Sequence, residues 1–224
     1  MDQIILMQYW WQLSLIGVVS YFLGNICGAV IVSNKFMHKD IRGLGSKNAG
    51  TTNMARVFGV KYGVATLLID LLKALICVLI AKVIMTSIGG AEAGRLAGYL
   101  SGCAVIVGHN YPLLLGLKGG KGFASGIGVF MALQPLFTLI LLVCGLLMLL
   151  IVDRMSVFAL TFFVVETIYA WMVVPIEEWW VPALVTVYLL LAVIAHWPNL
   201  VRLAHGEEKP LGLYHLLKYG KRAH

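Results

Sequence analysis

The segment DIRGLGSKNAGTTN, Asp40–Asn53, is rich in glycine and polar residues and lies between two long hydrophobic runs. The runs cover Tyr9–Ser33 and Tyr62–Ile88, so each has the roughly 20 apolar residues that a helix needs to cross a bilayer. Two further polar segments follow, GHNYPLLLGLKGGKGFAS at Gly108–Ser125 and HWPNLVRLAHGEEKP at His196–Pro210. Flexible polar segments between such runs predict loops at the ends of a membrane bundle.

The composition also indicates a membrane protein. Of the 224 residues, 60% are hydrophobic and only 12% are charged, with a mean hydropathy of +0.90. Soluble domains have roughly 45–50% apolar and about 25% charged residues. In such a chain the net charge of +7 is a topology signal before it is a sign of nucleic-acid binding. We expect one all-α, polytopic integral-membrane domain over residues 1–224, whose first apolar run is a retained helix.

Hydrophobic runs and one proline predict seven membrane segments. The run Phe123–Val152 is too long for one ordinary span, and Pro135 inside it removes a backbone donor. Splitting the run there puts most of the 17 Lys and Arg residues on the cytoplasmic side, with the N-terminus outside and the C-terminus in the cytoplasm. The expected segments are Tyr9–Ser33, Tyr62–Ile88, Leu96–Leu115 (interrupted by Gly108, His109 and Pro112), Phe123–Gln134, Leu136–Val152, Val157–Val174 and Trp180–His196.

Residues at the ends of the segments fit this topology. The tryptophans expected in an outer aromatic belt are Trp10, Trp11, Trp171, Trp179 and Trp180. The tail after Pro210 is a short basic amphipathic stretch, which we expect on the membrane surface. The four cysteines lie in apolar stretches without a C-x-x-C pattern, so they predict packing residues and no metal or redox site.

The first polar segment has the chemistry of an anion site. Glycines such as Gly45 and Gly50 let backbone amides turn toward a ligand, and Arg56 offers a planar fork that suits phosphate oxygens. The alternative is an ordinary turn followed by a helix whose cap is Thr52 or Asn53.

The second polar segment contains Lys118-Gly-Gly-Lys121-Gly, which can form a cationic nest for a phosphate. It is not a Walker loop, because Phe123 follows and no strand precedes it. The alternative is a pair of lysines that anchors a helix end.

In the third segment, His196, Asn199 and Arg202 have the spacing of one helix face. His196 could orient or deprotonate a hydroxyl, or it could simply end a span. The following glutamates, Glu207 and Glu208, are expected to pair with nearby cations and not to act as general acids.

Two charges fall inside the second span. Asp70 and Lys73 are three residues apart, which allows an ion pair on one helix face, although Asp70 could instead steady a cation of the polar loops. Lys82 lies nearer the outer end of the span and is expected to extend its amine to the interface.

Taken in order, the three segments resemble the motifs of the bacterial acyl-phosphate:glycerol-3-phosphate acyltransferase family, PlsY. GSKNAGTTNMAR at Gly45–Arg56 is similar to G-S-G-N-x-G-A-T-N-x-x-R. The other two segments are similar to G-H-x-F-P-x-x-x-x-F-K-G-G-K-G-V-A-T and to H-x-x-N-I-x-R-L-x-x-G-x-E. The resemblance implies acyl transfer from acyl-phosphate to the 1-hydroxyl of sn-glycerol 3-phosphate. The products would be lysophosphatidic acid and phosphate, made for phospholipid biosynthesis at the cytoplasmic face of the bacterial inner membrane.

The same resemblance implies the site residues. The catalytic residues would be Ser46, Arg56, Lys121 and His196. The substrate-binding residues would be Asn48, Gly50, Thr52, Asn53, Lys118, Gly119, Gly120, Ser156 and Asn199. Acyl-phosphate, glycerol 3-phosphate and the lipid bilayer would be the partners, without nucleic acid, cofactor, metal or an obligate protein partner. The acyl chain would lie in a groove between helices that is open to lipid.

Some residues depart from the family pattern. Lys47 replaces a glycine, Thr51 replaces an alanine, and Asn25 and Cys27 replace the Ser and Pro of G-S-I-P. Loop geometry and acceptor preference therefore stay open, including a divergent relative with another phosphorylated acceptor. A different class of function, a membrane transporter of phosphate or a small phosphorylated anion, also uses broken helices and cationic glycine loops. A transporter should place these charges near the bilayer midplane, whereas here they are predicted at one interface.

Overall fold

The structure, a computed structural model, describes residues 2–212, and every regular element in that range is helical. The all-α prediction is therefore confirmed for this part of the chain, and most of the predicted amphipathic tail lies outside the described residues. The helices are α1 (Asp2–Gln8), α2 (Trp10–Gly24), α3 (Gly28–Met37), α4 (Thr51–Val57), α5 (Val60–Asn110), α6 (Phe123–Leu133), α7 (Pro135–Val152), α8 (Met155–Val173) and α9 (Trp180–Ala204). Short 3-10 turns are η1 (Ile41–Gly43), η2 (Leu113–Leu115) and η3 (Ile176–Glu178).

Helix α5 contains two helical runs that fold back on each other. Gly90 separates them, with φ 82° and ψ −179°, a conformation essentially limited to glycine. The runs are antiparallel, because Cys77 Sγ lies 3.5 Å from Ser101 Oγ and Lys73 Nζ lies 2.8 Å from His109 Nδ1. The second run continues through His109, so the interruption predicted there is wrong, and the helix ends only at Asn110.

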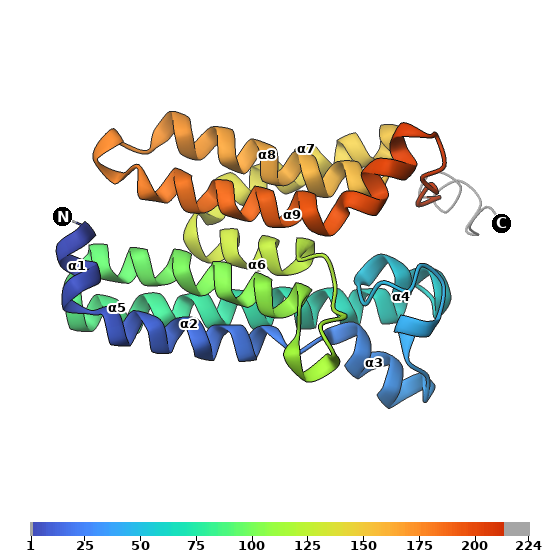
Figure 1. The fold of residues 1–224 in the computed structure, drawn as a ribbon. Coiled ribbons are helices and arrows are strands. Elements are labelled where there is room, and N and C mark those ends of the chain that lie inside the picture. Colours follow the sequence, from blue (N-terminus) through green and yellow to red (C-terminus); the bar gives the residue numbers. More distant parts are fainter. Residues whose placement is uncertain (1, 213–224) are drawn as a thin grey trace.

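The helices form two layers with α6 between them. One layer holds α2 and both runs of α5, and the other holds α7, α8 and α9 (Figure 1). Helix α5 packs most extensively against α6 and α2. Helices α2 and α5 meet without intervening side chains, because a Cβ on Gly24 would lie 2.9 Å from the Cα of Gly108. Small residues allow such close contacts between membrane helices.

Large apolar side chains cover the outside of the bundle. Ile151 is 86% exposed, Leu136 is 73% exposed and Val83 is 67% exposed. Such a surface is far more apolar than water tolerates, so we conclude that it faces lipid. Five helical stretches of the described chain are long and apolar enough to cross a membrane. They are Trp10–Met37, Val60–Leu115, Pro135–Val152, Met155–Val173 and Trp180–Ala204.

Pro135 breaks the fourth hydrophobic run as predicted. Helix α6 ends at Leu133, Gln134 leaves the helical conformation, and Pro135 begins α7. A buried carboxyl that the sequence analysis did not single out, that of Glu166 in α8, accepts hydrogen bonds from Gln134 Nε2 and from Thr138 Oγ1 at 3.2 Å. The amide and hydroxyl of the broken run are thereby satisfied within the bundle.

The first run departs from the prediction. The helix expected over Tyr9–Ser33 is two helices, α2 and α3, because residues 25–27 leave the helical conformation. In a single uninterrupted helix the backbone N–H and C=O groups of these residues would bond to one another. At the break they need hydrogen-bond partners from elsewhere in the fold.

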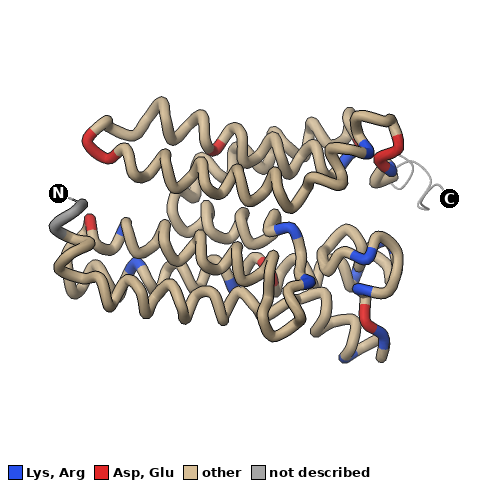
Figure 2. The backbone as a smooth tube through the Cα atoms, in the orientation of Figure 1, with Lys and Arg blue, Asp and Glu red and all other residues tan. Residues whose placement is uncertain are grey.

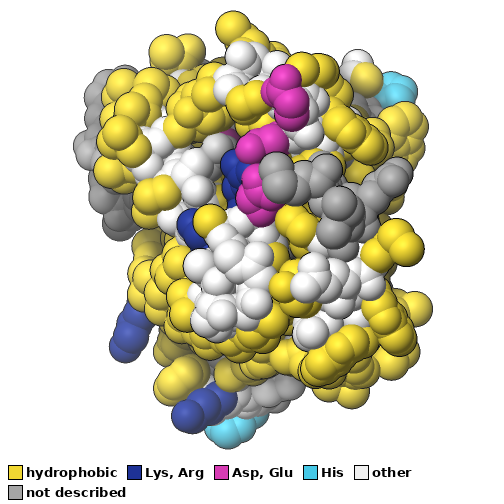
Figure 3. Space-filling view, turned by 90° about the vertical axis from the view of Figure 1, so that its left-hand side faces the viewer, with side chains coloured by type: hydrophobic (Ala, Val, Ile, Leu, Met, Phe, Trp, Pro, Cys, Tyr) yellow, Lys and Arg dark blue, Asp and Glu magenta, His cyan; other side chains and the backbone are white. Residues whose placement is uncertain are grey.

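The two ends of the bundle differ in charge. We call the end that holds α4, η2 and the C-terminal part of α9 the site end, and Lys and Arg residues gather there (Figure 2). The opposite end holds Gly90 and η3. Figure 3 looks onto it and shows a few charged side chains among hydrophobic and uncharged ones. An ion pair there joins Arg95 Nη2 to Glu178 Oε1 at 2.5 Å.

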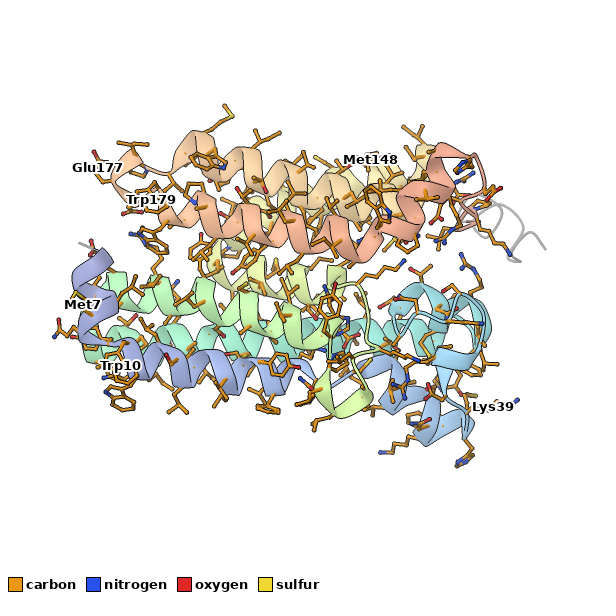
Figure 4. All side chains as sticks on the ribbon, viewed as in Figure 1. Met7, Trp10, Lys39, Met148, Glu177 and Trp179 are labelled. Atoms are coloured by element: carbon orange, nitrogen blue, oxygen red, sulfur yellow. The ribbon has the colours of Figure 1, made fainter. Side chains whose placement is uncertain are left out.

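Several tryptophans lie at the opposite end, but not all of them face outward, and the exposed Trp197 lies in the C-terminal part of α9 at the site end. Trp10 and Trp179 are 65% and 59% exposed (Figure 4). Trp180, expected in the same aromatic belt, is only 8% exposed and packs edge-on against Tyr99. Trp180 is therefore a core residue and not an interface residue.

Candidate active site

The first polar loop is organised by one buried amide. Asn53, which is 1% exposed, accepts a hydrogen bond from the Ser46 amide at 2.9 Å and donates to the carbonyls of Leu44 and Asn48 at 3.0 Å each. Both donors of Asn53 are used inside the loop. Asn53 was predicted to bind substrate, but the structure gives it the role of holding the loop around the substrate-binding candidates.

The start of α4 differs from the predicted helix cap. The N-cap is Gly50 and the helix begins at Thr51, so Thr52 and Asn53 lie in its first turn. A Cβ at position 50 would lie 2.8 Å from Asn48 Nδ2, so the Asn48 side chain would have to move to admit one. The Thr51 hydroxyl is buried and has no hydrogen-bond partner among residues 2–212.

Three polar side chains project from this loop and its helix. Ser46, Lys47 and Arg56 are exposed, and no hydrogen bond or ion pair engages their side chains within residues 2–212. Lys47 has a φ of 60°, in the left-handed region that favours glycine. The family glycine at this position is therefore explained by backbone geometry, and the lysine carries a conformational cost.

The second polar loop packs closely against the end of α5. The Gly119 amide donates to the Asn110 carbonyl at 3.3 Å, and the Gly120 amide donates to the His109 carbonyl at 3.0 Å. A Cβ on either glycine would clash with His109. Packing against the end of α5 therefore requires a glycine at both positions. Lys118 projects from this loop and is exposed.

Lys121 joins the second loop to α9. Its Nζ donates to Asn199 Oδ1, and Asn199 Nδ2 in turn donates to Glu208 Oε1 at 2.5 Å. Glu208 also accepts from Ser156 Oγ at 3.1 Å and from Arg202 Nε at 2.8 Å. One hydrogen-bonded chain therefore connects the glycine–lysine loop, the start of α8, α9 and the segment that follows α9.

Glu208 is the central acceptor of this hydrogen-bonded network, whereas its sequence position predicted only an ion pair with a cation. That pairing is confirmed, because Arg202 and Glu208 form an ion pair. Its additional contacts with Asn199 and Ser156 could not be found from spacing, since Ser156 is 52 residues away in the chain. Asn199 and Arg202 bind the same carboxylate, which confirms that they share a helix face.

The electrostatics of the site depend on burial. Burial and the nearby positive charge of Arg202 lower the pKa of Lys121 to about 8, although Glu208 opposes the shift. Burial raises the pKa of Glu208, but hydrogen bonds from Asn199, Arg202 and Ser156 outweigh it and leave that pKa below its ordinary value. At neutral pH the site therefore holds a lysine ammonium close to its titration point and an ionised glutamate.

His196 is buried one turn before Asn199 on α9. Its Nδ1 lies 2.9 Å from the Ala192 carbonyl oxygen, which can only accept, so Nδ1 carries the proton of the neutral ring. The lone pair is then on Nε2, which can accept a hydrogen bond from a hydroxyl. Lys121 and Glu208 lie close enough to interact electrostatically with this ring.

Residues that depart from the family pattern help to hold the loops. Asn25 Oδ1 accepts from the Leu114 amide at 3.0 Å, and the Cys27 thiol lies 3.7 Å from the Ala49 carbonyl. Arg42 of η1 donates to the Leu115 carbonyl at 2.7 Å. The first and second polar loops are therefore tied to each other and to the break between α2 and α3.

The structure brings some of the candidates into contact and leaves others apart. Lys121, Asn199 and Ser156 belong to one hydrogen-bonded chain, with His196 beside it. Ser46, Arg56 and Lys118 lie at the same site end, but within the described residues no contact joins their side chains to that chain.

Known proteins match this chain over most of its length. A sequence profile of the glycerol-3-phosphate acyltransferase family matches residues 14–206. A glycerol-3-phosphate acyltransferase of Finegoldia magna is 37% identical over 203 residues, which cover 89% of this chain and 96% of that protein. One of Clostridioides difficile is 36% identical, covering 88% of this chain and 95% of that protein.

Solved structures agree with the sequence matches. A crystal structure of PlsY (YgiH), an integral membrane glycerol 3-phosphate acyltransferase, in its glycerol 3-phosphate form superposes with a TM-score of 0.79 at 31% identity. The superposition covers 92% of this chain and 99% of the PlsY chain. The lysophosphatidic acid form of PlsY gives a TM-score of 0.76 at 28% identity, covering 89% and 95% of the two chains. With a family profile, close relatives and the helical membrane fold in agreement, this chain belongs to the glycerol-3-phosphate acyltransferase family.

Proposed function

We propose that this chain transfers a fatty acyl group from acyl-phosphate to the 1-hydroxyl of sn-glycerol 3-phosphate, for phospholipid biosynthesis. The hydroxyl oxygen attacks the acyl carbonyl carbon, the bond from that carbon to the phosphate oxygen breaks, and lysophosphatidic acid and inorganic phosphate are the products. The family membership supports the acceptor and the reaction class. The relatives described as glycerol 3-phosphate and lysophosphatidic acid forms support the acceptor and the product. Resemblance of the three polar segments to the PlsY motifs supports the donor.

The observation that carries the proposal is the junction of the glycine–lysine loop with α9. Lys121 reaches Asn199 across 78 residues of sequence, and its ammonium is partly removed from water. Desolvated cations bind phosphate groups more strongly than exposed ones, because the local dielectric constant is lower. Arg56 at the same end is unpaired among the described residues and is available for a second phosphate. Two cationic groups would offset the repulsion between two phosphorylated reactants.

The reaction needs little from the protein beyond position and charge. Acyl-phosphate is a mixed anhydride and is already activated, so a covalent enzyme intermediate is not required. Lys121 and Arg56 would hold the phosphates and stabilise the charge that develops on the leaving phosphate. His196 Nε2 would accept a hydrogen bond from the attacking hydroxyl and orient it. The hydroxyl proton would pass to a phosphate oxygen of a substrate.

We infer that the protein lies in the bacterial inner membrane with its site end at the cytoplasmic face. The excess of Lys and Arg at the site end supports its placement at the cytoplasmic face (Figure 2). The exposed tryptophans at the opposite end support an outer interface (Figure 4). Seven segments follow if α2 with α3, the two runs of α5, and α6 to α9 each count as one. The transporter alternative is not favoured, because the matched family consists of acyltransferases and the polar loops gather at one end.

A direct assay tests the proposal. Purified protein in detergent receives glycerol 3-phosphate with either acyl-phosphate or an acyl thioester, and lysophosphatidic acid is measured. We expect product from acyl-phosphate and little from the thioester. Product from the thioester alone would overturn the donor assignment. No product from either donor, together with glycerol 3-phosphate uptake by protein-containing liposomes, would establish the transporter instead.

A further inference from the structure

Three buried residues outside the proposed substrate contacts lie directly behind the polar loops. Asp70 and Lys73 form an ion pair at 2.9 Å, and their side chains are only 1% and 6% exposed. His109 Nδ1 lies 2.8 Å from Lys73 Nζ and 3.5 Å from Asp70 Oδ1, with a side chain 3% exposed. Charged groups inside a membrane bundle are costly, so a retained pair calls for an explanation.

This pair closes the break in the first membrane segment. Lys73 Nζ donates to the carbonyl of Gly24, the last residue of α2, at 3.2 Å, and to the carbonyl of Ile26 in the break. Asp70 Oδ1 accepts from the amide of Gly28, the first residue of α3, at 3.0 Å. A cation therefore lies at a helix C-terminus and an anion at a helix N-terminus, as the helix dipoles favour. Three backbone polar atoms at the break, the carbonyl oxygens of Gly24 and Ile26 and the amide of Gly28, are thereby satisfied within the protein.

The network also contacts the glycine–lysine loop on both sides of Lys121. Before it, the His109 carbonyl accepts the Gly120 amide, and a Cβ on Gly120 would clash with the His109 ring. After it, Ser125 Oγ in the first turn of α6 donates to the Asp70 carbonyl at 3.2 Å. The backbone that carries Lys121 is thus held at two points by the residues of one buried network.

Lys73 itself cannot bind a substrate in this arrangement. An ammonium has three protons, and the carboxylate of Asp70, two carbonyls and the His109 ring already surround it. Because an ammonium only donates, His109 Nδ1 accepts from it. Lys73 is therefore fully engaged within the protein and acts on the site only through the loops that the network holds.

We propose that Asp70, Lys73 and His109 are positioning residues, which lock the break between α2 and α3 to the glycine–lysine loop and so fix where Lys121 meets Asn199. The claim about loop position stands independently of the reaction. Its kinetic consequence rests on the proposed function.

The second buried carboxyl network provides a matched control. Glu166 is fully buried and is held by Gln134 and Thr138 on the α6–α7 break, with no contact to the polar loops among its hydrogen bonds. E166Q therefore changes a buried intramembrane carboxyl of similar burial in another part of the bundle. Any effect common to both networks reports general destabilisation and not loop position.

Hydrogen–deuterium exchange measured on the full chain in detergent tests the claim without substrates. The D70N/K73M variant removes both charges together, so neither is left buried and unpaired. In this variant we expect the Gly119 and Gly120 amides to exchange at least about tenfold faster than in the wild type. Exchange in peptides of α7 and α8 should be unchanged. E166Q should instead speed exchange in peptides of α7 and α8 and leave the Gly119 and Gly120 amides unchanged. Unchanged exchange at the two glycines, or an equal increase throughout the chain, would overturn the proposal. D70N/K73Q, which also leaves no buried charge unpaired, gives the same comparison if D70N/K73M does not fold.

The pH dependence of turnover provides a second readout. Lys121 faces Asn199, His196 and Arg202 of α9 and Glu208 of the following segment. In the wild type we expect its pKa of about 8 to set the alkaline limb of kcat/KM. A loosened loop would hydrate the Lys121 amine and raise its pKa, so D70N/K73M should move the alkaline limb toward pH 10.5. E166Q should lower only the amount of active protein. An unmoved limb in D70N/K73M would contradict the proposal, and an inactive wild type would instead contradict the proposed function.

Discussion

The two ends of the bundle are built from the same hydrophobic helices but differ in their backbone. All residues with positive φ in the described chain lie at the site end, except Gly90 at the hairpin tip of α5. The site end includes four that are not glycine: His38, Lys47, Leu117 and Asp153. The opposite end turns its chains with Gly90 and the short turn η3.

This contrast indicates where conformational strain is tolerated. Residues held in the left-handed region cost free energy and persist only where surrounding contacts enforce them. At the site end those contacts are buried polar groups, including Asn53 under the first loop and the Asp70–Lys73–His109 network under the second. At the opposite end the connection at Gly90 needs no such support, because glycine has no Cβ and adopts a positive φ without a steric cost.

The largest expected difference between the ends concerns their lysines. Replacing Lys121 with Ala at the site end should lower kcat/KM by roughly 100-fold or more, because a charge that stabilises the transition state is lost. Arg56→Ala should do the same. Lys82, which lies toward the opposite end, is the matched control, and Lys82→Ala should leave kcat/KM within about twofold.

Steady-state kinetics of the folded variants checks this prediction. Circular dichroism and gel-filtration profiles in detergent would establish that each variant is folded. Wild-type turnover in either Lys121→Ala or Arg56→Ala would remove that residue from the site assignment. A large loss in Lys82→Ala would remove the functional distinction between the ends.

Activity should fall as pH rises above the pKa of Lys121. With that pKa lowered to about 8, the ammonium fraction and kcat/KM decrease about tenfold for each further pH unit. Stability should move in the other direction. Between about pH 8 and pH 10.5, Lys121 is more protonated in the unfolded chain than in the native chain. The free energy of unfolding therefore increases as pH rises through this range.

Measuring kcat/KM and the free energy of unfolding over the same pH series separates these effects. The stability is best compared with Lys121→Ala, which lacks the titrating group. A parallel loss of activity and stability would mean that alkaline unfolding, and not Lys121, causes the loss.

Glu208→Gln should destabilise the protein at neutral pH by about 1–3 kcal/mol, because three donors lose an ionised acceptor. The pKa of Glu208 is lower in the folded state, so its contribution is present above the ordinary glutamate pKa and is lost as pH falls through the folded value. The difference between wild type and Glu208→Gln should therefore vanish in acid. Chemical denaturation at neutral and acidic pH tests this, and an equal difference at both would indicate a packing effect of the substitution.

The smallest expected effects come from a pair of backbone substitutions, one at each end. Gly90→Ala should destabilise the protein by about 1 kcal/mol through the backbone alone, since there is space for the added Cβ. Lys47→Gly should stabilise it by about 0.5 kcal/mol, the relief of a left-handed lysine less the entropy cost of glycine. Melting temperatures of both variants provide the test. A loss of stability in Lys47→Gly would show that the lysine side chain makes a compensating contact.

Several elements could be predicted because their cause is local. Pro135 cannot continue a helix, so the division between α6 and α7 follows from the sequence itself. Asn199 and Arg202 share a face because helical spacing puts them there. The ion pair of Asp70 and Lys73 follows from the same spacing.

Other features depend on contacts between distant parts of the chain. The break between α2 and α3 looked like continuous helix, because its partners Asp70 and Lys73 lie more than 40 residues away. Glu208 looked like a surface acid until Ser156 and Asn199 were placed beside it. The buried role of Trp180 likewise depends on Tyr99 of α5.

The sequence by itself determined that this is a helical membrane protein with three polar loops of a recognisable family, because hydrophobic length, proline and motif order act locally along the chain. Only the tertiary structure decided which polar atoms meet inside it. Lys121 meets Asn199 across 78 residues, and a buried ion pair closes a broken helix. The physical reason is that a buried polar group must find a partner, and in a bundle that partner is supplied by another helix whose position no local pattern specifies.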